Sequence, residues 1–173
     1  GDTMVAKPGK ANLEVTRRFL DGLCQLQAQI TGENSGKPYR IYYGNGNHEN
    51  RMNRERDVYG DRYDIYVEEL KKMGVAYLPD TSVDVYPDIR ISGVDLEERF
   101  YKKFPERRWR KGIWKNDWEK PIQRNFRFLL AHSPLFWMPM RHGGADLVLS
   151  GHFHGGTIRI PGLGGLMTPQ FQF

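Results

Sequence analysis

Two segments of the chain carry apolar residues at the spacing of an amphipathic helix. The first runs from about Leu13 to Ile30, and the second runs from Asp61 to about Met73. Apolar residues three and four positions apart form one stripe along a helix, so each helix is expected to pack one face on a core. Gly74 follows the second segment and is expected to cap it. The residues expected to face the core are Phe19, Leu20, Leu23, Leu26 and Ile30 in the first helix and Tyr63, Ile65, Tyr66, Leu70 and Met73 in the second.

Six shorter segments are rich in β-branched, aromatic or other apolar residues, as strands are. They are Tyr39–Tyr43, Ser82–Tyr86, Ile89–Val94, Phe126–Leu130, Leu147–Ser150 and Thr157–Ile160. The second and third alternate in polarity and are expected to pair, whereas the fifth has the continuous apolar run of a buried strand. Strands interleaved with helices predict an α/β fold, and 173 residues are the size of a single domain.

Side chains that can bind a metal follow three of these strands. Asn47 and His48 come after the first strand, His132 after the fourth, and His152 and His154 after the fifth. In open α/β sheets, ligands bind beyond the carboxyl ends of the strands, so this placement favours one shared rim. In extended backbone, two histidines two positions apart point to the same side. Two converging imidazoles indicate a metal site, although an ordinary half-exposed surface pair is compatible with the same spacing.

Composition identifies a charged segment, and it excludes a membrane-spanning helix and an intramolecular disulfide within these residues. Of the net charge of +5, much lies in Arg99–Lys120, within a basic insert at Leu96–Lys120 that also carries Trp109, Trp114 and Trp118. Such a segment is typical of a solvated loop or helix, and it leaves open the binding of a nucleic acid or an anionic membrane surface. The chain has no apolar run of about 18 residues, which excludes a membrane-spanning helix within it. Cys24 is the single cysteine, which excludes an intramolecular disulfide.

With these residues in view, the sequence resembles the calcineurin-like metallophosphoesterase family. That family carries, in order, an Asp-x-His, a Gly-Asp, a Gly-Asn-His-Asp/Glu, a single His after a strand, and a Gly-His-x-His. Here Gly1–Asp2, Gly46–Glu49, His132 and Gly151–His154 match the second to fifth blocks in the same order. The first block is absent from these residues, so we expect a partial domain that lacks the family's first strand and its last strands.

The resemblance implies a two-sheet sandwich flanked by helices (αββα) and a dinuclear centre of divalent metal ions, namely Mn, Fe or Zn. In this family such a centre hydrolyses a phosphomonoester or a phosphodiester with a metal-activated water. The metal ligands implied are Asp2, Asn47, His132, His152 and His154. Asp2 would bridge the two ions, and His154 would serve the ion whose other ligands belong to the absent block.

The resemblance also assigns residues that act on the substrate. His48 is the catalytic residue implied, as a general acid or a stabiliser of negative charge near the leaving group. Arg51 is a candidate for binding a phosphate oxygen, and Glu49 a candidate for orienting His48. The family often carries an acid at the position of Val5 that orients the catalytic histidine, so the sequence leaves open how His48 is held.

Partners follow from the same chemistry. The expected partner is a phosphate-ester substrate, with no nucleic acid required, and the insert Leu96–Lys120 is expected to cap the site and select that substrate. Membrane association stays open through a segment that these residues do not contain. These 173 residues alone are expected to show weak or no turnover. The alternative function is a non-catalytic binding module on the metallophosphoesterase scaffold, which recruits partners.

Overall fold

A computed structural model describes most of the chain in two compact units. The described residues are 2–3, 6–7, 13–31, 41–101, 126–136, 140, 143–154, 158–162 and 164–167. Contacts divide the chain into Gly1–Leu78 and Pro79–Phe173, and each unit has its own structure. The α/β class is confirmed, whereas the single domain over residues 1–173 stays a prediction. Within the described ranges, no helix combines the length and the apolar character needed to cross a membrane.

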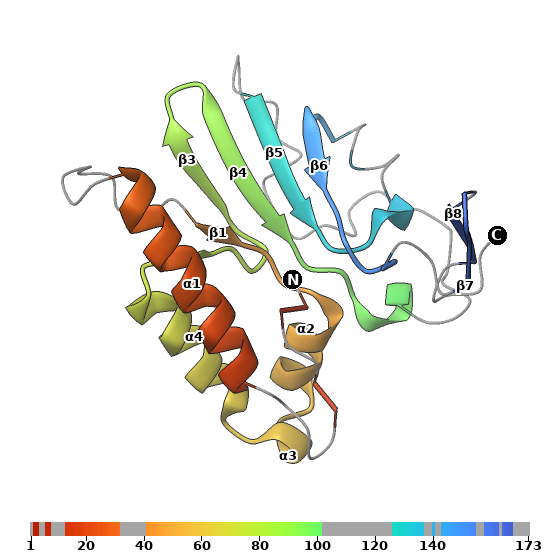
Figure 1. The fold of residues 1–173 in the computed structure, drawn as a ribbon, viewed down its shortest axis with the longest axis horizontal. Helices are drawn as coiled ribbons and strands as arrows, with labels where there is room; N and C mark the ends of the chain where they lie inside the picture. The colour runs from red at the N-terminus through yellow and green to blue at the C-terminus, as the bar shows by residue number, and fades with distance from the viewer. Residues whose placement is uncertain are drawn as a thin grey trace. The chain divides into compact units, whose positions relative to one another are not determined.

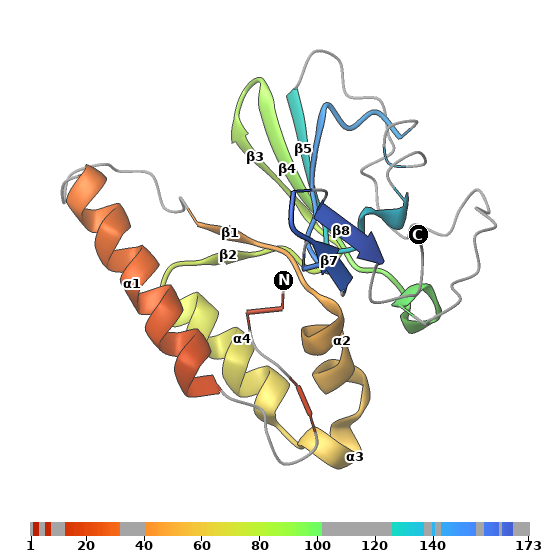
Figure 2. The same ribbon diagram turned by 45° about the vertical axis from the view of Figure 1, so that its right-hand side comes forward.

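In its described residues, the first unit contains four helices and a pair of parallel strands. Its elements are α1 (Leu13–Thr31), β1 (Tyr42–Tyr43), α2 (Asn47–Arg54), α3 (Arg56–Tyr59), α4 (Arg62–Lys72) and β2 (Ala76–Tyr77). In the strand pair, Tyr42 lies opposite Ala76. The helices α1 and α4 run side by side next to these strands (Figures 1 and 2).

Both predicted helices are present, and α4 ends as expected. Gly74 adopts a left-handed backbone with φ of 70°, the conformation that a glycine after a helix supplies without steric cost. In α4, the core receives Tyr63, Tyr66 and Leu70, whereas the prediction for Ile65 is wrong because that side chain is 42% exposed.

The buried face of α1 is also rotated from the predicted one. Leu20 is buried as expected, but Phe19 and Leu26 are more than half exposed. The face that packs on the core instead carries Thr16, Leu20 and Leu23, at positions i, i+4 and i+7. The helix has more apolar side chains than one packed stripe can cover, so periodicity alone placed two of them on the wrong side.

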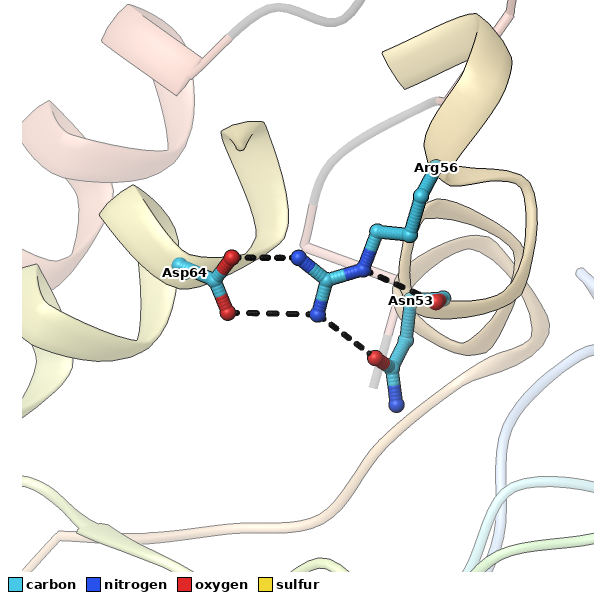
Figure 3. Close-up of polar contacts among 3 residues, drawn as sticks. All are labelled: Asn53, Arg56 and Asp64. Atoms are coloured by element: carbon cyan, nitrogen blue, oxygen red, sulfur yellow. Dashed lines mark hydrogen bonds and ion pairs between the residues drawn. The ribbon is translucent and has the colours of Figure 1, made fainter. Parts of the chain in front are cut away.

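Arg56 ties the short helix α3 to its neighbours (Figure 3). Its guanidinium makes a bidentate contact with Asp64 in the first turn of α4, with Nη2 donating to Oδ1 at 3.1 Å. Nη2 also donates to Oδ1 of Asn53 at 2.8 Å, and Nε donates to the Asn53 carbonyl at 2.9 Å. One side chain therefore joins the end of α2 to the start of α4.

The second unit contains a mixed four-stranded sheet. Its elements are β3 (Ser82–Tyr86), β4 (Ile89–Val94), η1 (Glu98–Tyr101), β5 (Phe126–Ala131), η3 (Pro134–Phe136), β6 (Leu147–Leu149), β7 (Ile158–Ile160) and β8 (Gly164–Met167). The sheet order is β3-β4-β5-β6 (Figure 1). The strands β3 and β4 form the predicted pair, which is antiparallel, and β4, β5 and β6 are parallel. Parallel strands end at one edge, so the residues that follow β5 and β6 are neighbours.

The burial of β6 differs from the sequence expectation. Leu147 is 41% exposed and Leu149 is 50% exposed, so the prediction of a buried strand is wrong. The reason is that β6 lies at the end of the four-stranded sheet and pairs with β5 on one side. The core of this unit contains residues of β4 and β5 and residues that pack against them. They are Val94, Leu96, Phe100, Leu129, Ala131 and Met140.

Candidate functional site

The start of α2 holds the carboxylate of Asp2. Gly46 is the N-cap of this helix, and the backbone N–H of His48 donates to Oδ1 of Asp2 at 3.0 Å. Backbone N–H groups in the first turn of a helix lack partners within the helix, and the helix dipole favours an anion there. A Cβ atom on Gly46 would lie 2.5 Å from the backbone nitrogen of Asp2 and 2.7 Å from its Cγ. Only a glycine at this position lets Asp2 approach so closely.

Glu49 joins the Asp2 segment to the loop before α2. Its carboxylate is fully buried and accepts hydrogen bonds from three backbone N–H groups. These belong to Asp2 at 2.9 Å, Thr3 at 3.2 Å and Gly46 at 3.0 Å, and the Tyr43 hydroxyl donates to it as well. The sequence suggested that Glu49 orients His48, but these contacts make it the anchor of Asp2 and Thr3 instead.

His48 is oriented by the backbone of Ala6. The Ala6 N–H lies 3.1 Å from Nδ1 of His48, and the Ala6 carbonyl oxygen lies 3.3 Å from the same nitrogen. Nδ1 can therefore accept from the N–H or donate to the carbonyl, depending on the tautomer. The sequence left open how His48 is held, and the backbone N–H and carbonyl of Ala6 supply these contacts. Arg51 lies beside it, with Nη1 donating to the same carbonyl at 3.5 Å.

Asn47 offers an oxygen that fits a metal ligand. Its side-chain Oδ1 is buried and accepts no hydrogen bond from the residues that the structure describes. Leaving a buried amide oxygen without a partner costs free energy, so a native structure normally supplies one. A divalent cation is a suitable partner, because amide and carboxylate oxygens together with imidazole nitrogens form a mixed O/N donor set.

In the second unit, two predicted ligands lie against each other. His132 directly follows β5 and is buried, and its carbonyl accepts a hydrogen bond from the Gly151 N–H at 2.9 Å. This bond brings the chain after β6 next to the chain after β5. The imidazole rings of His132 and His152 are 5.1 Å apart between centroids, at an interplanar angle of 69°. Of the described residues, His154 has no ring contact with either, and its side chain is exposed.

Left-handed backbone is concentrated at the predicted ligands. Asp2, His152 and His154 have φ of 58°, 68° and 52°, and Asp80 is the fourth non-glycine residue of this kind in the described ranges. The expectation of extended backbone through His152 and His154 is therefore wrong. Residues with a Cβ atom adopt this conformation at a cost of about 1 kcal/mol or more, and such strain often occurs at functional sites.

The sequence did not single out Tyr101, which lies beside the two histidines. Its ring centroid is 5.1 Å from that of His152 and 6.1 Å from that of His132. Tyr101 is the last residue of η1 and belongs to the insert Leu96–Lys120. The aromatic character of the insert was the available signal, although it drew attention to the three tryptophans. These lie outside the described residues, as do positions 102–120 as a whole.

Two tyrosines next to Glu49 have shifted ionisation. Burial raises the pKa of Tyr43 and of Tyr66, and the negative charge of Glu49 raises both further. The hydroxyls of both tyrosines contact Oγ1 of Thr3, at 2.9 and 3.1 Å respectively. The segment that carries Asp2 thus rests on a buried network of neutral phenols around one carboxylate.

Comparison with protein families gives one match over most of the chain. The family model described as calcineurin-like phosphoesterase matches residues 1–156. All of the ligand candidates and His48 fall within this range. Comparison with curated proteins and with solved structures found no match.

Proposed function

Since the chain belongs to the calcineurin-like phosphoesterase family, we propose that it is a metal-dependent enzyme that hydrolyses a phosphomonoester or a phosphodiester. Members of this family typically bind divalent metals, and the family implies the metallophosphoesterase fold predicted from the sequence. We further propose two ions per site, chosen from Mn, Fe and Zn, because the donor atoms are a mixture of oxygen and nitrogen.

The left-handed backbone at Asp2, His152 and His154 is the observation that supports this proposal most directly. Strain of this kind persists only where the surrounding structure imposes it, and it is common where side chains must converge on a ligand. A hydrogen bond from the Asp2 N–H to Glu49 accompanies it at Asp2. A short turn, in which the Phe153 N–H donates to the Gly151 carbonyl at 2.8 Å, accompanies it at His152.

The proposed ligands offer both oxygen and nitrogen atoms. Asp2 supplies a carboxylate and Asn47 an amide oxygen, while His132, His152 and His154 supply imidazole nitrogens. Bound divalent cations would polarise the phosphate ester and lower the pKa of an attacking water. The protein's part is to fix the donors beforehand: Glu49 holds the backbone of Asp2, and the N-terminus of α2 holds its Oδ1.

His48 is the proposed proton donor to the leaving group. Its Nδ1 faces both polar groups of Ala6, so its Nε2 is the nitrogen available to substrate. A proton on Nε2 would pass to the leaving oxygen as the ester bond breaks. Arg51 lies close to the same Ala6 carbonyl and is proposed to contact a phosphate oxygen.

Hydrolysis of p-nitrophenyl phosphate and of bis-p-nitrophenyl phosphate in the presence of Mn²⁺ tests the proposal. We expect EDTA to abolish turnover and Asn47→Ala to do the same by removing a ligand. His48→Ala should lower kcat by about a hundredfold or more while Mn²⁺ binding persists. The matched control is His142→Ala, which changes the one histidine outside the proposed site.

Two results would overturn the proposal. The first is turnover that persists in EDTA and in both site variants, since the activity would then come from elsewhere. The second is a folded chain that binds no Mn²⁺, which would favour the non-catalytic binding module.

A further inference from the structure

The first residues of the insert are anchored in the core of the second unit. Leu96 is 4% exposed and Phe100 is 2% exposed, and both pack with Val94, Leu129 and Ala131. The Phe100 N–H donates to the Glu97 carbonyl at 3.0 Å, which closes the turn of η1. The backbone of Tyr101 therefore follows a residue that is fixed in the core, and its position is set by that anchor.

The ring of Tyr101 closes a triangle with two imidazoles. It lies edge-on to His152 at 5.1 Å and 66°, and tilted against His132 at 6.1 Å and 45°. The two imidazoles are themselves 5.1 Å apart at 69°. The centroid distances fall in the range in which aromatic rings attract each other, and the two contacts of His152 are edge-to-face.

We propose that Tyr101 is a positioning residue that fixes the orientation of the His132 and His152 rings relative to each other. An imidazole binds a metal only in a narrow range of ring orientations, and neighbouring groups normally hold that orientation before the metal arrives. His152 needs such support in particular, because its backbone is left-handed. The inference rests on the proposed function in one respect, namely that the ligand of these histidines is a metal ion.

The contribution comes from the ring of Tyr101 rather than from its bulk alone. Phe153 also contacts His152, with 5.8 Å between centroids, but among the described residues Tyr101 is the one ring that contacts both histidines. A leucine at position 101 would keep apolar volume without the edge-to-face contacts, whereas a phenylalanine would keep both.

Metal titration of Tyr101→Leu and Tyr101→Phe in the full chain tests this role. Mn²⁺ affinity is measured calorimetrically, and the visible absorption spectrum of bound Co²⁺ reports the ligand geometry. We expect Tyr101→Leu to weaken Mn²⁺ binding about tenfold and to alter the Co²⁺ spectrum. Tyr101→Phe should keep the Mn²⁺ affinity and the Co²⁺ spectrum of the wild type. Circular dichroism without metal establishes that each variant is folded.

Two outcomes would overturn the inference, and they are distinguishable. If Tyr101→Leu binds Mn²⁺ with wild-type affinity and gives the wild-type Co²⁺ spectrum, the ring does not position the histidines although the metal chemistry stands. If the folded wild-type chain binds neither ion, the proposed function fails and the positioning role fails with it.

Discussion

Among the glycines that the structure describes, Gly46 has the least room for a side chain. A Cβ atom at this position would meet the backbone nitrogen and the Cγ of Asp2. We expect Gly46→Ala to displace Asp2 and to weaken Mn²⁺ binding by about tenfold or more. Calorimetric titration measures this effect, and wild-type affinity in the variant would contradict the close approach of Asp2 to α2.

Gly22 provides the matched glycine control. It lies in the middle of α1, and a Cβ atom there would meet nothing within 4 Å. Alanine has the higher helix propensity, so Gly22→Ala should raise the free energy of unfolding by about 1 kcal/mol. Urea unfolding checks this value, and Mn²⁺ affinity should not change. A loss of stability would show that the position is not an open helical one.

The buried phenol of Tyr43 predicts how stability depends on alkaline pH. Its folded pKa is raised by burial and by Glu49, so it stays neutral while the unfolded chain ionises above about pH 10. A group with a raised folded pKa stabilises fully below the unfolded pKa and loses that contribution as the pH rises. Above pH 10, Tyr43→Phe should therefore lose stability less steeply than the wild type, by about 1.4 kcal/mol per pH unit.

Urea unfolding of both proteins between pH 9 and about 11 measures this slope. Tyr66, whose pKa is raised in the same way, is present in both and cancels in the comparison. At neutral pH the variant should be less stable, because it loses the hydrogen bond from Tyr43 to Glu49. Equal slopes in the two proteins would show that Tyr43 ionises as freely when folded as when unfolded.

The residues of the candidate site differ in how far along the sequence their motifs and contacts extend. The sequence identifies Asn47, His48, His132 and His152 as candidates because their motifs are short and local, and their roles stay a prediction. The partners of Glu49 could not, because the hydrogen bonds to Asp2 and Thr3 span more than 40 positions of sequence. Local patterns identify the type of a residue and leave the identity of such distant contacts undetermined.

At the scale of elements, the N-terminus of α2 is the structure on which the first unit's candidate ligands depend. Glu49→Gln keeps the shape of the side chain but turns an NH₂ group toward backbone N–H donors. We expect the free energy of unfolding to fall by about 2 kcal/mol, because a buried donor is left without an acceptor. The matched control is Glu68→Gln on the exposed side of α4, which should leave stability nearly unchanged. Equal losses in the two variants would contradict the network.

The helix α2 also shows the limit of the apolar pattern. Its sequence NHENRMNR has Met52 as the one apolar residue, so no stripe indicated a helix there. The hairpin of β3 and β4 was predicted from its apolar pattern, because the alternating residues gave the bounds of both strands correctly. Elements that pack through apolar faces can be predicted from the sequence, whereas those built around a capping carboxylate cannot.

For the whole molecule, the apolar pattern predicts the class of fold but does not show that the chain divides into two compact units. Each compact unit has its own core, one around Tyr66 and Leu70 and the other around Val94 and Leu129. Periodicity shows that a helix or strand has an apolar face, but it does not show which of its apolar side chains pack on the core. This is why the predicted orientation failed at Phe19 in α1, whereas Leu147 is exposed because β6 is the last strand of its sheet.

The central claim is that the chain binds divalent metal through the predicted ligands, and titration with Mn²⁺ tests it most directly. Calorimetry on the folded 173-residue chain should show binding at a ratio of about one or two ions. His152→Ala should abolish or strongly weaken that binding, whereas His142→Ala should preserve it. Absence of binding by a chain that circular dichroism shows to be folded, or binding that His152→Ala leaves intact, would contradict the account.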